Sequence, residues 1–385
     1  MTEIIAFPKL KVKKIFTIFG VINILEFEVV VVGDWLPRSF FGSFYLLFAA
    51  IRSIYLAVYL LICGFSCDAI IADQITFHLP LLKLCSRNGV LFYCHFPDKF
   101  LAPKGDGILR QGVYRRVLDW AEEECLALGA DVIVVNSRFT QAKFKEAFAS
   151  IKLVPEVLYP GVNVPSESEI DSKTNFKFKI ILSLNRFERK KDLHFAIEAF
   201  KLSKSNDLKL ILAGGYDSRV LENREHLKEL QDLCDKLGLK HQTLFRSDYE
   251  TVETIDLSET DVTFLPSISQ ETKQTLLKSS LALIYTPSNE HFGIVPIEAM
   301  SQGLPVIAMN SGGPKETVAD GVGYLCEADS EDLARCIDKL LVKGEDVMGG
   351  AGKKRVDSFF SLKVFGDRLN SLLLQLNNNS KQKSQ

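Results

Sequence analysis

The chain has 385 residues, which suits two domains of ordinary size better than one. Hydrophobic residues make up 47% of it and include 27 Phe, so a sizeable core is available. The formal net charge of -2 argues against general nucleic-acid binding, which usually brings a strong basic excess, so no nucleic-acid partner is expected. The 8 cysteines show neither metal-ligand nor disulfide-framework spacing, which predicts reduced thiols in a cytosol-facing protein.

The first apolar segments do not form a signal peptide, because Lys11, Lys13 and Lys14 interrupt them. The apolar stretch 39–65 is long enough to span a bilayer, but Arg52 lies at its middle, where a charge is costly. Three interpretations stay open: a helix in a membrane face, a buried domain helix, or a true span. The first fits best, and it predicts a membrane-associated protein.

Residues 1–161 predict an N-terminal α/β domain. Its apolar runs at 68–73, 90–98 and 131–140 indicate buried parallel strands, each followed by a polar loop, and 108–129 is helical in pattern. His95 directly follows the second run and suits a residue that reaches into a cleft, although a lone histidine at a strand end is as often structural.

Residues 162–177 are polar and aperiodic, which predicts a linker. Strand and helix patterns alternate again over 178–375, and this alternation predicts a second doubly wound sheet. The low-complexity residues 376–385 predict a disordered tail. The expected fold class is therefore α/β with two Rossmann-like domains facing a cleft, where loops at the carboxyl ends of the strands bind ligands.

The main candidate site is the segment 285–316. Glu290 and Glu298 lie in it with seven residues between them, and Pro296 suits the first turn of a helix. Amides around Gly293 and Ile294 would then be free to bind a diphosphate at the helix N-terminus. One carboxylate can accept hydrogen bonds from a ribose and the other can face a sugar ring. In isolation, such a pair is more often a helix-start residue and a solvated loop residue.

Two basic residues follow the strand at 178–185, namely Arg186 and Lys191, and both are placed to neutralise a diphosphate. Their neighbours Arg189 and Lys190 are expected on a solvated face. Two glycine pairs after strands allow close backbone approach: Gly214 with Gly215, and Gly312 with Gly313.

Ten segments together resemble glycosyltransferase family four, and more closely its mannosyltransferases of the dolichol-linked oligosaccharide pathway. They are residues 33–38, 73–74, 91–98, 117–124, 135–140, 157–164, 185–193, 213–226, 285–300 and 310–316. The resemblance implies the GT-B arrangement and a retaining transfer of mannose from GDP-mannose. The implied acceptor is mannosyl-chitobiose diphospho-dolichol, which receives an alpha-1,3 and then an alpha-1,6 mannose. The implied place is the endoplasmic reticulum membrane, on its cytosolic face, and the implied partners include other glycosyltransferases of the pathway.

The resemblance also assigns roles by motif position. Glu298 would hold the donor ribose, Glu290 would face the mannose, Arg186 and Lys191 would bind the diphosphate, and His95 would contact the transferred sugar. The remaining implied donor-binding residues are His291, Phe292, Gly293, Ile294 and Val295. Neither a metal nor a cofactor is expected, because basic side chains and helix amides take the charge.

One departure concerns the first strand–loop–helix unit. Family members open it with a Gly-Gly pair, whereas this chain has a single glycine, Gly20, before Gly33. We expect the unit to be missing or replaced, with an exposed sheet edge in its place. Two alternatives follow: another sugar-nucleotide glycosyltransferase of the same fold, or an inactive donor-binding membrane scaffold.

Overall fold

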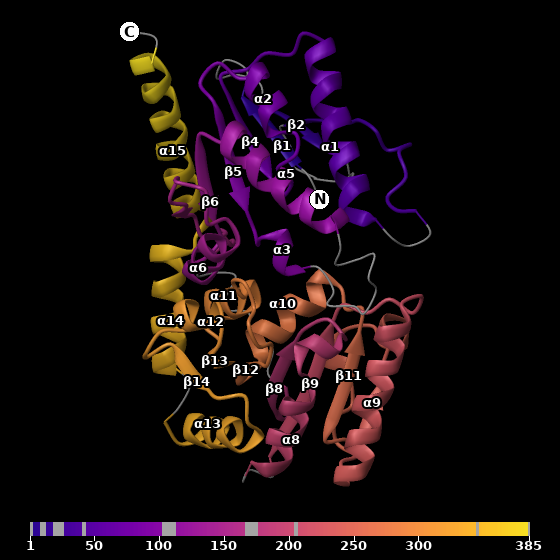
Figure 1. Ribbon diagram of the computed structural model, residues 1–385. Helices are drawn as coiled ribbons and strands as arrows, with labels where there is room; N and C mark the ends of the chain where they lie inside the picture. Colours follow the sequence, from indigo (N-terminus) through magenta and orange to yellow (C-terminus); the bar gives the residue numbers. More distant parts are fainter. Residues whose placement is uncertain are drawn as a thin grey trace. The chain divides into compact units, whose positions relative to one another are not determined.

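A computed structural model describes residues 3–7, 13–17, 27–40, 44–101, 113–165, 176–203, 207–343 and 346–383. The chain divides into two compact units (Figure 1). Unit 1 comprises Met1–Tyr159 and Gly366–Gln385, and unit 2 comprises Pro160–Phe365. The predicted division differs at the C-terminus, because Gly366 and the residues after it group with unit 1 and not with the donor-side domain. Most of the predicted linker, residues 166–175, lies outside the described residues.

The predicted disordered tail is also wrong over most of its length, because α15 (Leu362–Lys383) continues through it. Leu372 and Leu376 lie four residues apart on this helix and are buried, so an apolar stripe anchors it. Extending a helix costs less free energy than nucleating one, so the polar residues that follow can continue the anchored turns of α15.

Unit 1 is built on a mixed sheet with the strand order β3-β2-β1-β4-β5-β6-β7. From β4 to β7 the strands are parallel, as the apolar runs predict. β1 is antiparallel to both β2 and β4, and β2 is parallel to β3. The strands are β1 (Glu3–Phe7), β2 (Lys13–Thr17), β3 (Phe27–Val31), β4 (Ala69–Asp73), β5 (Val90–Cys94), β6 (Val132–Val135) and β7 (Glu156–Val157).

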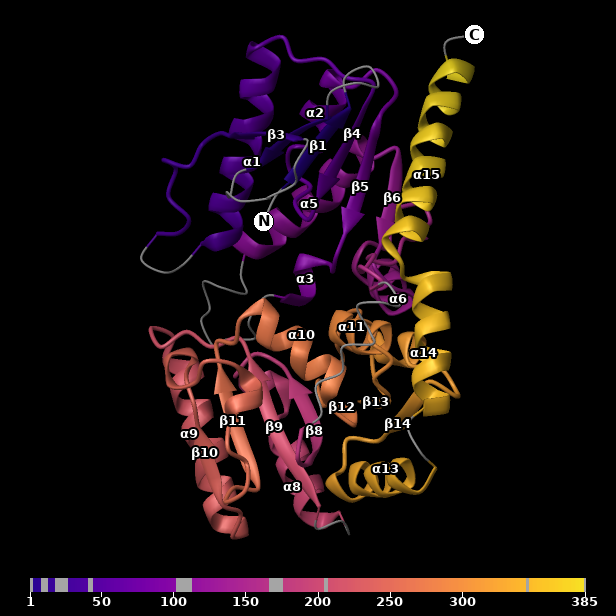
Figure 2. The same ribbon diagram turned by 180° about the vertical axis from the view of Figure 1, so that it is seen from behind.

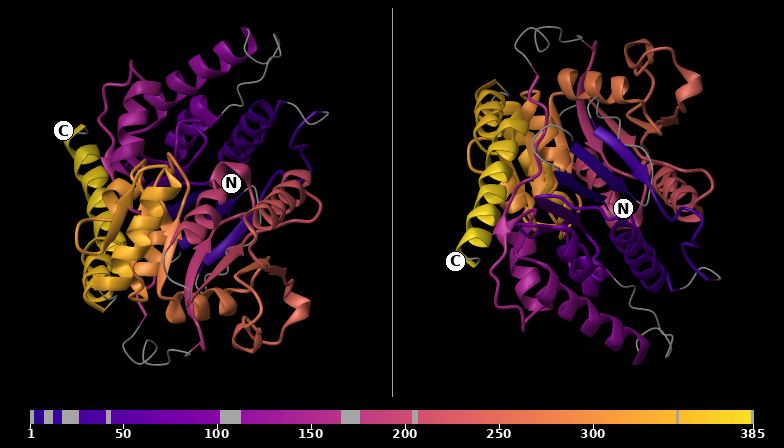
Figure 3. Two further views of the ribbon diagram at one scale, coloured as in Figure 1. Left: turned by 90° about the horizontal axis from the view of Figure 1, so that it is seen from below. Right: turned by 90° about the horizontal axis from the view of Figure 1, so that it is seen from above.

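β1 overturns the expectation of an exposed edge. Its backbone pairs with β4 from Ile4 opposite Ala72 to Phe7 opposite Ala69, so the amides and carbonyls of β4 are satisfied on that side. The three N-terminal strands lie side by side in indigo in the view from above (Figure 3). Because β1 and β4 are antiparallel, a parallel strand–helix–strand unit does not join these two strands.

The helices of unit 1 include the apolar stretch of the sequence. Leu56, Ala57 and Leu60 on one face of α1 are buried in the same core as Leu79 and Leu82 of α2. The helices are α1 (Tyr45–Ile62), α2 (Leu79–Cys85), α3 (Asp98–Leu101), α5 (Val113–Gly129), α6 (Arg138–Ala147) and the end of α15.

Unit 2 is built on a fully parallel sheet with the order β10-β11-β9-β8-β12-β13-β14. The strand order changes direction between β8 and β12. Open parallel sheets bind ligands beyond the carboxyl ends of the strands at such a point. The strands are β8 (Lys179–Leu184), β9 (Leu208–Gly214), β10 (His241–Thr243), β11 (Val262–Pro266), β12 (Ala282–Tyr285), β13 (Val306–Met309) and β14 (Gly323–Cys326).

Helices cover both faces of this sheet. Ile181, Leu210 and Phe264 of the strands pack into one core with α8, α9 and α13, and α8 lies beside α13 in both Figure 1 and Figure 2. Their strand neighbours Ile180 and Ile211 point the opposite way and are buried as well, on the side that α10 and α11 contact. The helices are α8 (His194–Leu202), α9 (Leu221–Leu237), α10 (Gln270–Ser279), α11 (Ile294–Ser301), α12 (Pro314–Thr317), α13 (Ser330–Lys343) and α14 (Asp346–Phe359), with short 3-10 turns η1 (Arg189–Lys191), η2 (Arg246–Asp248) and η3 (Val252–Thr254).

Candidate functional site

The loop after β8 carries both predicted basic residues, and it holds them differently. Lys191 ends the turn η1, where its side chain is mostly buried and its Nζ lies 2.5 Å from Glu290 Oε2. Its carbonyl accepts a hydrogen bond from Thr286 Oγ1 (2.7 Å), which ties the turn to the end of β12. Arg186 is more than half exposed and pairs with Glu188 (Nη1 to Oε1, 2.8 Å). Lys191 is thus fixed in place, whereas Arg186 can move toward a ligand.

Glu290 lies in the loop after β12 and is the partner of Lys191. Its Oε2 also accepts a hydrogen bond from Tyr285 Oη at 3.3 Å. Burial raises the pKa of Glu290, but the hydrogen bond from Lys191 and the charges of Lys191 and His291 outweigh burial, so the pKa lies below its usual value. Burial and the neighbouring Glu290 carboxylate raise the pKa of Tyr285. At neutral pH Glu290 is therefore a carboxylate and Tyr285 a neutral phenol.

Glu298 lies in the second turn of α11. The helix begins at Ile294, directly after Gly293 in the left-handed conformation (φ 81°), so Pro296 is its third residue and Glu298 its fifth. Proline is tolerated at that position because the first four amides of a helix have no acceptor within it. Glu298 Oε1 pairs with Lys273 Nζ of α10 at 2.7 Å.

The glycine pairs bring the loops of unit 2 close together. A Cβ on Gly214 would lie 2.1 Å from the carbonyl oxygen of Asn185, and one on Gly312 would lie 2.4 Å from that of Glu290. Gly313 donates its N–H to the same Glu290 carbonyl at 2.7 Å. The backbone that approaches these glycines is the protein's own, and through it they fix the loops that carry the charged side chains.

Two hollows in unit 2 adjoin these groups. One of about 260 Å³ lies where β8, β9 and β11 end and α10 begins, and its lining includes Arg186, Gly214, Gly215, Ser267 and Lys273. The other, of about 630 Å³, includes Glu298, Ile294 and Gln274. The second volume falls within the range of small-molecule sites, and the first is somewhat below it. Phe292, a predicted donor-binding residue, has a buried ring whose centre lies 6.0 Å from that of Phe360.

His95 belongs to unit 1 and has a carboxylate partner. It follows β5, is about half exposed, and its Nε2 lies 2.9 Å from Asp73 Oδ1 at the end of β4. Ser137, after β6, accepts a hydrogen bond from the amide of Thr140 at 2.9 Å and so caps the N-terminus of α6.

Sequence reasoning missed Lys273 and Tyr285, the partners of the two predicted glutamates. Lys273 occupies an ordinary polar position of an amphipathic helix, and Tyr285 is the last residue of an apolar strand. Neither position carries a local signal, because each partnership depends on how the helix and the strand meet in space.

Comparison with known proteins identifies the chain. The family model "Glycosyl transferases group 1" matches residues 166–355. An alpha-1,3/1,6-mannosyltransferase of Dictyostelium discoideum is 39% identical over 382 residues, covering 91% of this chain and 86% of the relative. The human enzyme of the same name is 41% identical over 365 residues, covering 89% and 82%. The chain belongs to the alpha-1,3/1,6-mannosyltransferase family.

The fold has solved counterparts at low sequence identity. Sucrose-phosphate synthase from Thermosynechococcus elongatus aligns with a TM-score of 0.65 at 20% identity, covering 86% of this chain and 78% of that one. Anabaena HepE in complex with UDP and glucose aligns with a TM-score of 0.61 at 19% identity, covering 90% and 86%. The prediction of two Rossmann-like domains of GT-B type is confirmed.

Family membership also confirms the predicted activity. The chain is a glycosyltransferase, a mannosyltransferase of dolichol-linked N-glycan precursor assembly. Membership implies a nucleotide-sugar donor, a lipid-linked acceptor and the endoplasmic reticulum as compartment. It does not assign the individual side chains.

Proposed function

We propose that the chain moves mannose from GDP-mannose to a mannosyl-chitobiose diphospho-dolichol acceptor, first as an alpha-1,3 and then as an alpha-1,6 branch. Lys191 and Arg186 neutralise the diphosphate, Glu298 holds the ribose, and Glu290 faces the mannose. His95 contacts the transferred sugar. Configuration is retained if the leaving phosphate assists the incoming hydroxyl on the same face of the sugar.

The observation that carries the proposal is the pair of lysine–carboxylate contacts in unit 2. Lys191 with Glu290 and Lys273 with Glu298 place two cations and two carboxylates on loops and helices at the carboxyl end of one parallel sheet. A fixed ammonium stabilises charge that grows on a leaving diphosphate, because it needs no reorganisation during the reaction. Arg186, more than half exposed beside the smaller hollow, can add its charge when the donor arrives.

The choice of donor is tested by competition. GDP should displace a labelled GDP-mannose from the purified full-length protein at concentrations well below those needed for UDP. The reverse order would indicate a glycosyltransferase for another sugar nucleotide.

The transfer is tested with GDP-mannose and the synthetic lipid-linked mannosyl-chitobiose diphosphate. The expected products carry one and then two further mannoses, which linkage-specific mannosidases distinguish. Donor binding with no product under conditions where a curated relative is active would support the scaffold alternative.

We further propose that α1 meets the cytosolic face of the endoplasmic reticulum membrane. By length and composition it is the one described helix that could cross a bilayer. Its inner face is packed in the core of unit 1, so contact through the outer face fits better than a free span. That outer face exposes apolar side chains: Tyr45, Ile51, Ile54, Val58, Tyr59 and Ile62.

Vesicle flotation tests this contact. Ile54→Glu with Val58→Glu should release the protein from vesicles of endoplasmic reticulum lipids, because charges replace the apolar contact. Val342→Glu, an exposed apolar position in unit 2, is the matched control and should float like the wild type. Flotation of both variants would contradict the proposed contact.

A further inference from the structure

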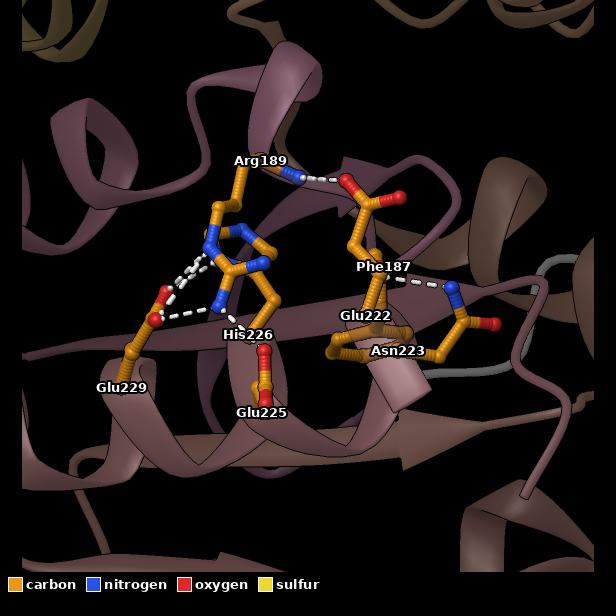
Figure 4. Close-up of polar contacts among 7 residues, drawn as sticks. All are labelled: Phe187, Arg189, Glu222, Asn223, Glu225, His226 and Glu229. Atoms are coloured by element: carbon orange, nitrogen blue, oxygen red, sulfur yellow. Dashed lines mark hydrogen bonds and ion pairs between the residues drawn. The ribbon is translucent and has the colours of Figure 1, made fainter. Parts of the chain in front are cut away.

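The start of α9 makes a set of polar contacts with the loop after β8 (Figure 4). Asn223, on the first turns of this helix, is buried and uses both ends of its amide. Its Nδ2 donates to the carbonyl of Phe187 at 3.0 Å, and its Oδ1 accepts from the amide of Asp217 at 2.9 Å. Phe187 follows β8 and Asp217 follows β9, so one side chain connects the two loops.

Arg189 makes a second, outer contact with the same helix. Its guanidinium lies between Glu225 and Glu229, at 2.9 and 2.6 Å, and its backbone amide donates to Glu222 at 3.3 Å (Figure 4). His226 Nδ1 lies 3.1 Å from Glu229. Arg189 lies on an exposed face, as expected, and its contacts there connect the turn η1 to α9.

In the sequence these contacts fall between the two diphosphate-binding residues of the proposed function. Arg186 immediately precedes the carbonyl that Asn223 holds, and Lys191 comes two residues after Arg189. The amide of Phe187 also donates to the carbonyl of Gly215 (2.9 Å), and the buried ring of Phe187 packs into the core. Asn223 thus supplies the side-chain connection between the loop of Arg186 and the loop of the first glycine pair.

We propose that Asn223 is a positioning residue for donor diphosphate binding, acting by fixing the loop that carries Arg186 and Lys191, with Arg189 as a secondary support. Asn223 is too buried to contact the donor, so its effect reaches the ligand only through this loop. The inference rests on the proposed roles of Arg186 and Lys191. It predicts that substitution of Asn223 weakens the contacts with the phosphates of the nucleotide and leaves those with the nucleoside unchanged.

The test compares the affinities of the full-length protein for GMP and GDP. In the wild type, GDP should bind more tightly than GMP because the additional phosphate meets the basic loop. Asn223→Ala should lower the affinity for GDP by about tenfold and the affinity for GMP much less, because the loss of two hydrogen bonds to backbone groups frees the loop. Asn223→Asp should behave similarly, because its carboxylate keeps the acceptor for the Asp217 amide but cannot donate to the Phe187 carbonyl. Lys228→Ala, which removes an exposed ion pair on the same helix, is the control and should keep the wild-type ratio.

A merely structural role gives a different result. If Asn223→Ala lowers both affinities by the same factor, or leaves both unchanged in a folded protein, the inference is wrong. Should this variant fail to fold, Arg189→Gln decides by the same ratio, with a smaller loss in the same direction expected and an unchanged ratio contradicting the inference. A wild type that binds GDP no more tightly than GMP would instead remove the proposed roles of Arg186 and Lys191.

Discussion

The two sheets present different chemistry at the carboxyl ends of their strands. In unit 2, Lys191 and Lys273 each hold a carboxylate. In unit 1, the described residues place His95 beside Asp73, while Glu122 of α5 is buried near the charges of Asp98 and Arg115. The same architecture therefore places lysine–carboxylate pairs beside two hollows in unit 2, whereas in unit 1 the enclosed cations Lys99 and Arg115 pair with carboxylates of α3 and α5. This contrast favours the second unit as the place where leaving-group charge is stabilised.

Substitution of Lys191 should cause the largest loss of turnover, so it is the strongest test of this difference between the units. Lys191→Ala removes the fixed ammonium and leaves Glu290 buried without its main partner, so kcat should fall roughly 10²- to 10³-fold. Lys190→Ala, at the neighbouring exposed position paired with Glu188, is the matched control and should stay within about twofold of the wild type. Equal losses in steady-state turnover would show that general loop charge, and not this one contact, matters.

His95 tests whether unit 1 contributes to the chemistry at all. His95→Ala should lower turnover by about 10², the usual scale for a side chain that acts on the reacting groups, with little change in donor affinity. His241 offers a comparable pair with an aspartate in unit 2, with 3.1 Å between His241 Nε2 and Asp235 Oδ1, and His241→Ala should leave activity intact. Turnover of His95→Ala near the wild-type rate would reduce this histidine to a structural role.

The order of elements around the site was predictable because it depends on local pattern. The apolar runs that end before His95, Arg186 and Glu290 are the strands β5, β8 and β12, and polar side chains after parallel strands gather at one edge. Among the helices that were not predicted is α9, whose amphipathic pattern is dominated by charged residues, several of which contact the loop after β8.

Long-range partners were not predictable. Lys191 and Glu290 are 99 residues apart in sequence, and nothing in either segment requires that they touch. The antiparallel pairing of β1 with β4 likewise depends on the free edge of β4, and no glycine motif in the sequence predicts it. The prediction of a disordered C-terminus rested on composition alone. Leu372 and Leu376 anchor α15 there, and the polar residues continue this helix.

Glu298 should affect binding more than turnover. Glu298→Ala removes the proposed ribose acceptor and the partner of Lys273, so donor affinity should fall roughly 30-fold, about 2 kcal/mol, with kcat changed much less. Glu271→Ala, an exposed acidic position on α10, controls for a general loss of negative charge. Calorimetric titration with GDP separates the two effects, and a pure kcat loss with unchanged affinity would contradict the placement.

The prediction for Glu122 concerns stability, and neither turnover nor donor binding. Burial, reinforced by the charge of Asp98 and opposed by Arg115, raises the pKa of Glu122 to about 8. The folded chain then holds a proton that the unfolded chain releases near its ordinary pKa, so stability falls as the pH rises between these two values. One such proton contributes at most about 1.4 kcal/mol per pH unit.

Glu122→Gln removes this titration and keeps the shape of the side chain. Between pH 6 and pH 8 the wild type should lose more stability in urea unfolding than the variant, and the two curves should converge toward pH 5. For Glu290 the pH dependence of stability has the opposite sign. Its pKa is lowered on folding, so its contribution to stability is present above its unfolded pKa and is lost as the pH falls. Parallel curves for the wild type and Glu122→Gln across pH 6 to 8 would mean that Glu122 is ionised in the folded state, and this difference between the two units would disappear.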